Sequence, residues 1–350
     1  MHKSLYAALA ALSLAAWILL PRLDVRDATL SARAPAEASG GAIAKALDAL
    51  LASLDDAQRA KAVFGYDDKE RFNWHFIPRE RKGLPLGELD AAQTAKADAL
   101  LAASLSAAGV RTVAQVRSLE SVLAEIEGPN RRFPRDPDLY FVSVFGKPSA
   151  DGAWGWRFEG HHLALNFTLE GDTLVSSTPL FFGANPAEVM SGPKKGLRVL
   201  GPVEDAAREL VQSLDEEQRA VAVGKEKPAE VEGTESAVYS GDRPTGLSAD
   251  RLTQDQRKIL RKLVNQHLKH VEDGSRDRLR REFLRGKLAQ IQFVWRGGLA
   301  AGEGHSFLVH SPDFVISYAN FQNDAKHIHS GLRALRGEFG HAAPSDASAK

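Results

Sequence analysis

Imidazole, carboxylate and amide side chains gather in two stretches of this chain. The first is Trp154–Asn166, which reads Trp-Gly-Trp-Arg-Phe-Glu-Gly-His-His-Leu-Ala-Leu-Asn, and the second is Asn320–Ser330. The second contains His327-Ile328-His329, and an extended segment would place both of these rings on one face. Imidazoles are ligands for Zn, Cu, Fe and Ni, so the two stretches predict one site that uses both clusters.

The principal hypothesis is a single divalent transition metal ion (Zn, Cu, Fe or Mn) held by imidazoles. A catalytic metal needs an open position and hydrogen bonds behind its ligand rings. The candidate ligands are His161, His162, His305, His327 and His329. The candidate catalytic residues are Glu159, His161 and Arg157, and Arg157 could instead be an ion-pair partner of Glu159. The candidate substrate-binding residues are Trp74, His75, Trp156, Asn166, Asn185, Asn320, Gln322 and Asn323.

The same residues also support interpretations that need no metal. Histidines at hairpin tips and strand ends can bond backbone carbonyls, and the tryptophans can be core residues. Without a metal, Glu159 and His161 could form a general acid/base pair of a hydrolase. The sequence thus leaves open a metal-dependent hydrolase or oxidoreductase acting on a small extracytoplasmic molecule, and a non-catalytic binding or structural protein.

Composition excludes several classes of protein. Lys plus Arg equals Asp plus Glu, 45 against 45, so no global charge attracts nucleic acid. The absence of cysteine excludes disulfides, thiolate nucleophiles and Fe–S clusters. The chain contains no Gly-x-Ser-x-Gly elbow, P-loop or His-Glu-x-x-His motif. The expected partner is therefore a small molecule.

The N-terminus predicts export. Met1-His2-Lys3 precedes the apolar run Leu5–Leu20, which is typical of a cleaved export signal or an uncleaved membrane anchor. Residues 1–41 are accordingly signal or anchor plus linker, and the remainder is expected to be periplasmic or secreted. Residues 341–350 are expected to form a disordered tail.

Hydrophobic periodicity predicts an α+β fold. Helices are expected at 42–63, 83–109, 110–127, 203–222, 249–269 and 275–288. Strands are expected at 140–145, 163–169, 173–178, 291–295, 306–309 and 314–318, and residues 72–78 are expected to form a short strand or an extended segment. Loops are expected at 181–186 and 224–244.

The N-terminal and C-terminal parts of the chain contain similar sequence segments in the same order. Residues 51–60 resemble 211–220, and Arg157–Phe167 corresponds to Leu308–Tyr318. This predicts two related helix–helix–strand–hairpin halves, about 42–200 and 203–340, packed as one large domain with a mostly antiparallel sheet. Ser311-Pro312-Asp313 reads as a turn, so Gly160-His161-His162 is expected at a hairpin tip. At a tip, both rings can point towards one place.

Several motifs together resemble the family called domain of unknown function 3500. They are Trp-His-Phe-Ile-Pro at 74–78, Trp-Arg-Phe-Glu-Gly-His-His-Leu-Ala-Leu-Asn-Phe at 156–167, Phe-Phe-Gly-Ala-Asn-Pro-Ala-Glu-Val at 181–189, Ser-Leu-Asp-Glu-Glu-Gln-Arg at 213–219 and His-Ile-His-Ser at 327–330. The resemblance covers residues 42–340. It implies exported proteins of bacteria and also of fungi, with no settled activity. The family tends to have Glu-Tyr-Asp-Asn where this chain has Ser317-Tyr318-Ala319-Asn320, which puts any role for those two acids in doubt.

Overall fold

A computed structural model describes residues 37–285 and 288–340 of the chain. This part contains nine α-helices and one mixed, mostly antiparallel sheet of thirteen strands, so the expected α+β class is confirmed. Within it, no helix is both long and apolar enough to span a bilayer. The apolar run of the expected export segment and the expected disordered tail lie outside the described residues.

The first part of the chain supplies four helices and seven strands. They are α1 (Glu37–Leu51), α2 (Asp56–Ala62), β1 (Val63–Phe64), β2 (Leu84–Pro85), α3 (Ala91–Ser104), α4 (Ala107–Glu127), β3 (Tyr140–Phe145), β4 (Ala153–Gly160), β5 (Leu163–Glu170), β6 (Thr173–Ser176) and β7 (Leu180–Ala184). The second part supplies α5 (Gly201–Ser213), α6 (Glu216–Ala222), β8 (Val223–Gly224), β9 (Leu247–Ser248), α7 (Gln254–Leu268), α8 (Asp273–Arg285), β10 (Gln292–Gly297), β11 (His305–His310), β12 (Phe314–Phe321), α9 (Gln322–Ala325) and β13 (His327–Ala334).

Strand pairing is repeated on the two sides of the sheet's centre. The order is β1-β3-β4-β5-β7-β13-β12-β11-β10-β8, with β2 on β3, β6 on β5 and β9 on β10. On each side a two-residue strand runs parallel to the first long strand, and every other pairing is antiparallel. The β7–β13 pair joins the two sides, and we call it the seam. This repetition is what related halves would produce, and their common origin stays a prediction.

The helix starts repeat as well. Asp55 and Gln58 form a capping box at α2, and Asp215 and Gln218 form one at α6. Each glutamine also exchanges amide hydrogen bonds with the capping glutamine of the next helix, at 2.8–3.0 Å for Gln58 with Gln93. A cap of this kind stabilises a helix by about 1 kcal/mol. Here it also fixes the short helices against the longer ones.

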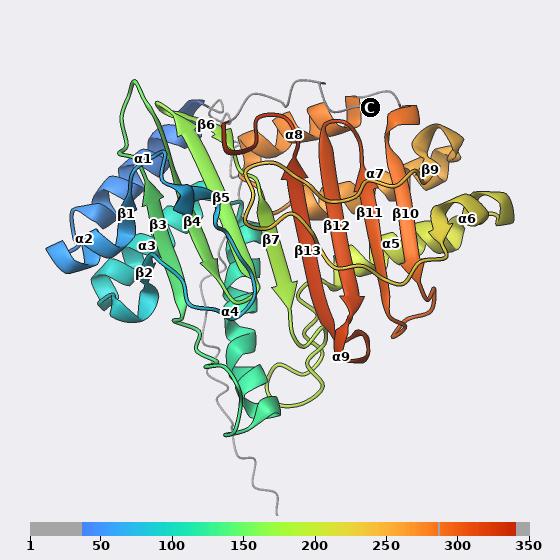
Figure 1. Ribbon diagram of the computed structural model, residues 1–350, viewed down its shortest axis with the longest axis horizontal. Coiled ribbons are helices and arrows are strands. Elements are labelled where there is room, and N and C mark those ends of the chain that lie inside the picture. Colours follow the sequence, from blue (N-terminus) through green and yellow to red (C-terminus); the bar gives the residue numbers. More distant parts are fainter. Residues whose placement is uncertain (1–36, 286–287, 341–350) are drawn as a thin grey trace, which may run out of the picture. The chain divides into compact units, whose positions relative to one another are not determined.

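The two faces of the sheet are covered differently. The helices pack on one face and enclose the main core with Trp154, Trp156 and Trp295. Two irregular segments cross the other face, the first strap (residues 65–83) and the second strap (residues 225–246), as Figure 1 shows. Beneath them lies a second apolar cluster, in which Phe76 stacks on Phe181 with ring centroids 3.9 Å apart. We call these the helix face and the strap face.

Some expected elements are wrong. Residues 72–78, expected to be a short strand or an extended segment, are not a strand and belong to the first strap, whose backbone bonds other segments instead of a sheet neighbour. Residues 181–186, expected to be a loop, contain most of the central strand β7. The strands at 140–145 and 314–318 and the hairpin at 163–176 are confirmed. The helix expected at 42–63 is divided into two helices, α1 and α2. The loop expected at 224–244 is the second strap, which covers one face of the sheet and buries Val231.

Candidate metal centre

Four imidazoles meet at one end of the seam, on the strap face. His161 and His162 are the two turn residues between β4 and β5, as expected, and their rings stack with centroids 3.8 Å apart. His327 and His329 come from the start of β13. The Nε2 atom of His162 lies 2.7 Å from Nε2 of His327 and 3.3 Å from Nε2 of His329. The two clusters of the sequence therefore form one group.

The backbone forces the His162 ring into this position. His162 has a φ of 64°, in the left-handed region that costs a non-glycine residue about 1–3 kcal/mol. Its N–H donates to the Phe76 carbonyl and its carbonyl accepts from the Gly183 N–H, both at 2.8 Å. A Cβ at position 183 would lie only 2.7 Å from Cγ of the His162 ring. Glycine at 183 therefore makes room for the ring.

Carboxylates stand behind two of the rings. Oε1 of Glu120, on α4, lies 2.5 Å from Nδ1 of His161, and Oε1 of Glu230, in the second strap, lies 2.7 Å from Nδ1 of His329. Arg135 also approaches Nδ1 of His161, at 3.3 Å, but the shorter carboxylate contact assigns the proton to that nitrogen. Each Nδ1–H then donates to a carboxylate, and each Nε2 keeps a lone pair. Metal-binding histidines usually have such a partner.

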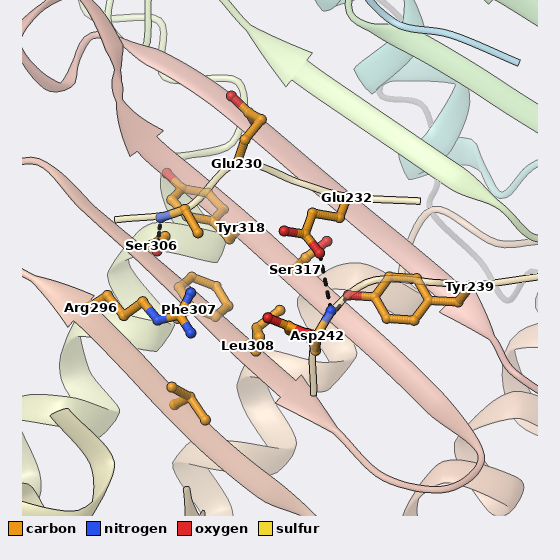
Figure 2. Close-up of a pocket in the computed structure, with 12 residues that line it drawn as sticks. Glu230, Glu232, Tyr239, Asp242, Arg296, Ser306, Phe307, Leu308, Ser317 and Tyr318 are labelled. Atoms are coloured by element: carbon orange, nitrogen blue, oxygen red, sulfur yellow. Dashed lines mark hydrogen bonds between the residues drawn. The ribbon is translucent and has the colours of Figure 1, made fainter. Parts of the chain in front are cut away.

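The second strap is fixed where it presents Glu230. Gln322 donates to Glu230 at 2.7 Å, and the N–H of Ala229 donates to Ser306 Oγ at 3.0 Å. Figure 2 shows Glu230 at the edge of a small cavity beneath this strap, its carboxylate pointing away from Glu232. The cavity has a volume of about 30 Å³, room for one or two waters. The strap thus holds Glu230 in place and leaves little free space.

Burial favours the neutral form of three rings of the cluster, His161, His162 and His327. Burial lowers the pKa of His162 well below its ordinary value, and the neighbouring histidines lower it further. Burial, with His329 and His161, lowers the pKa of His327 to about 3. Burial also lowers the pKa of His161 although Glu120 opposes this effect. Since metals bind neutral imidazole, these rings need lose no proton to become ligands at neutral pH.

Three of the imidazoles lie close enough together that they could hold a transition metal if their spacing changed. His161, His162 and His327 each place a possible ligand atom within 4.8 Å of the others. Ring nitrogens about 2.0–2.1 Å from a tetrahedral ion are roughly 3.3–3.4 Å apart. His162 and His329 meet this spacing at 3.3 Å, and the 2.7 Å separation of His162 and His327 must open by roughly 0.6 Å. The group of His161, His162 and His327 could therefore hold a metal ion once these separations change.

A pocket reaches the cluster at His161. It has a volume of about 420 Å³ and lies between the first strap, the segment before β3 and the His161–Glu120 pair. Pockets of roughly 300–1,000 Å³ hold small molecules in proteins. The cluster therefore has a space beside it in which a small molecule could meet His161.

A family model described as "Protein of unknown function (DUF3500)" matches residues 36–341. The chain belongs to the DUF3500 family. A comparison with curated proteins and another with solved structures find no match. The family resemblance expected from the motifs is confirmed, and the chemistry of the site has to be argued from its geometry.

In this DUF3500 chain Arg157 and Glu159 form a separate group on the strap face. Arg157 Nη2 lies 2.7 Å from carboxylate oxygens of both Glu159 and Glu70, so the expected ion pair is present. Glu159 also accepts from the His75 N–H at 3.0 Å and lies 3.7 Å from Nε of Arg81. Burial raises the pKa of Glu159 although both arginines oppose it. Among the described residues no hydrogen bond or ion pair joins Glu159 to the four histidines, so the structure does not bring the expected catalytic trio together.

The structure also leaves His305 out of the cluster. His305 pairs with Asn320, and Asn320 pairs with Ile328, which lies in the main core. Directly paired residues share a face, so His305 faces the helices, opposite His329. There its ring stacks on Trp295 with centroids 4.7 Å apart, and its Nδ1 lies 2.9 Å from the Glu303 carbonyl.

The expected substrate-binding residues divide into three groups. Asn320 and Gln322 support the cluster, since Asn320 accepts from the His327 N–H at 3.1 Å and Gln322 holds Glu230. Two are structural: Trp156 stacks on Phe167 in the main core, and Asn166 donates to the Pro179 carbonyl. Among the described residues, the others form no hydrogen bond with the four rings: Trp74 is buried in the strap-face cluster, His75 lies 3.3 Å from Glu235, Asn185 is half-buried and Asn323 is exposed.

Sequence reasoning missed both carboxylates of the cluster. Glu120 lies inside a 21-residue helix, where a glutamate normally faces solvent, yet it is only 4% exposed. Glu230 lies in a segment that reads as a surface loop. Neither has a local signal, because each meets its histidine only through tertiary packing.

Proposed function

We propose that this protein is a metal-dependent enzyme whose histidine cluster holds one divalent transition metal ion beside a substrate pocket. The observation that carries the proposal is the convergence of two imidazole nitrogens on Nε2 of His162, with carboxylates behind His161 and His329. Nε2 of His162 carries at most one proton, so it can donate a hydrogen bond to only one of the two neighbouring Nε2 atoms. A cation would satisfy all three lone pairs at once.

Among the reactions open to such a centre, hydrolysis makes use of residues already in place. The ion would act as a Lewis acid and lower the pKa of a bound water. Glu120 lines the pocket as well as contacting His161, so its carboxylate is available as a general base at the pocket wall. His162, buried and fixed by two backbone hydrogen bonds, would serve as the rigid ligand.

The alternative is a small-molecule-binding protein without turnover. The 2.7 Å separation of His162 and His327 favours it, because this is an ordinary hydrogen-bond length between two neutral rings. In that case the pocket would hold a ligand and the rings would only close its wall.

Elemental analysis of the purified protein separates the two functions. We expect close to one equivalent of Zn, Cu, Fe or Mn in the wild-type chain and none in a His161→Ala/His327→Ala double variant. The control is His310→Gln, since His310 bonds the Pro244 carbonyl away from the cluster. Wild-type protein that contains no metal and takes up none of these ions would exclude the enzyme proposal and leave the binding function.

We propose further that the protein acts outside the cytoplasm, on the strength of the basic start and the apolar run Leu5–Leu20. N-terminal sequencing of chain recovered from the periplasm or culture fluid would distinguish a cleaved signal from an anchor. Recovery of the full-length chain from the cytoplasm alone would contradict export.

A further inference from the structure

The pocket beside His161 has mainly apolar walls. Its apolar and aromatic lining comes from Pro78, Phe133, Pro134, Leu139, Tyr140 and Phe141. Leu139 is 40% exposed, an unusual position for a large apolar side chain, and it lies at this pocket. Such walls favour a ligand with an apolar body, because each Å² of apolar surface removed from water contributes about 25 cal/mol.

The two arginines that line the pocket are already engaged. Arg81 donates to the carbonyls of Ile77 and Gly160, at 2.6 and 3.2 Å, and its Nε faces Glu159. Arg79 pairs with Glu235 at 2.5 Å. Neither guanidinium is therefore free to bind an anionic ligand.

Two acids of the pocket have no ion-pair partner among the described residues. Glu80 and Asp136 line it, and neither forms an ion pair with another described residue. Glu120 also lines the pocket, and its Oε1 lies 2.5 Å from Nδ1 of His161. The available charge in the pocket is consequently negative, and a ligand carboxylate or phosphate would be repelled.

We propose that this pocket binds a small molecule with an aromatic body and an uncharged or cationic head group, placed against His161 and Glu120. The assignment rests on the proposed function in one respect: the head group is the part that would meet the metal centre. Apolar walls select the body, and unpaired carboxylates select against negative charge.

Three probes with one body test the charge selection: 3-phenylpropionamide, 3-phenylpropylamine and 3-phenylpropionate. Binding to the metal-free full chain is measured by ligand-observed NMR titration. We expect the amide and the amine to bind at least ten-fold more tightly than the acid. Equal or tighter binding of the acid would overturn the charge argument, and binding of none of the three would overturn the pocket assignment.

A pair of tryptophan variants tests the location. Leu139→Trp fills the pocket from a half-exposed position and should weaken amide and amine binding at least ten-fold. Met190→Trp is the matched control, because Met190 is 69% exposed and does not line the pocket. Equal binding by the two variants would show that the probes bind elsewhere.

Metal content separates this inference from the proposed function. Leu139→Trp should retain the wild-type amount of metal, since the substitution removes none of the four histidines and neither carboxylate behind them. Probe binding without metal would support the pocket assignment while refuting the enzyme. Metal binding without probe binding would support the enzyme proposal while refuting the pocket assignment.

Discussion

Replacing Gly183 by alanine should disable the proposed metal centre without replacing any ligand. An ideal Cβ at this position lies 2.7, 2.8 and 3.0 Å from Cγ, Cδ2 and Cβ of His162. Carbon atoms prefer separations of about 3.5–4.0 Å, so the ring must retreat by roughly 0.8 Å. Ligand distances in metal sites are held within about 0.2 Å, so this movement would remove His162 from a bound ion.

The expected loss of affinity is large compared with the loss of stability. Disturbing a supporting residue typically costs about 10–100-fold in metal affinity, and displacement of a ligand should cost at least about 100-fold. Overpacking a buried site costs about 1–3 kcal/mol in the free energy of unfolding. We would measure Zn²⁺ affinity by competition with a chelating indicator and stability by urea denaturation.

Gly331→Ala is the matched control for this variant. Gly331 also lies on a seam strand, but a Cβ there would meet Ser317 Oγ at 3.1 Å and Val231 at 3.2 Å, and none of the three nearest atoms belongs to a histidine. Its metal affinity should stay within a few-fold of wild type. The reasoning is refuted if Gly183→Ala binds Zn²⁺ as tightly as wild type, or if both glycine variants lose affinity equally.

Three further outcomes follow from the same contacts. Glu230→Ala should lower metal affinity about 10–100-fold by removing the acceptor behind His329, and unchanged affinity in the same titration would assign Glu230 to strap packing alone. Arg157→Ala should cost about 3–5 kcal/mol in urea denaturation, because Glu159 is left buried without its closest cation, and the loss should be smaller when Glu159→Ala is added. Burial lowers the pKa of His267 to about 4. As the pH falls below about 6.5, this residue therefore becomes protonated in the unfolded chain but stays neutral in the folded chain. The native state should therefore lose about 2 kcal/mol from this residue between pH 7 and pH 5, and His267→Gln should show a correspondingly shallower decline; identical pH profiles would contradict this.

Local signals in the sequence were sufficient for part of the site. The His161-His162 turn follows from its correspondence with Ser311-Pro312-Asp313, and the alternation of His327 and His329 follows from strand geometry. Both depend on short-range rules, which the tertiary structure left intact.

The errors arise where tertiary contacts decide. His305 begins a strand after a loop, and nothing local indicates which face its first residue takes. Residues 181–186 are expected to be a loop because of the prolines at 179 and 186. The tertiary structure instead places most of this segment at the centre of the sheet, as the strand β7 paired with β13. Glu120 is buried only because α4 passes beside the hairpin turn.

The seam explains why the candidate site is asymmetric in a sheet whose pairing is repeated. At one end of the seam, the β4–β5 turn brings His162 to Gly183 and His329. At the other end, the corresponding β11–β12 turn brings Asp313, whose carbonyl accepts from the Leu335 N–H at 2.8 Å. That end is closed by a buried ion pair of Arg333 with Glu338 instead of imidazoles. The strand order therefore places a hairpin turn beside each end of the seam. Only the side chains at each end decide which one can hold a metal. Since His162 comes from one half and His327 and His329 from the other, the proposed centre depends on the pairing of β7 with β13.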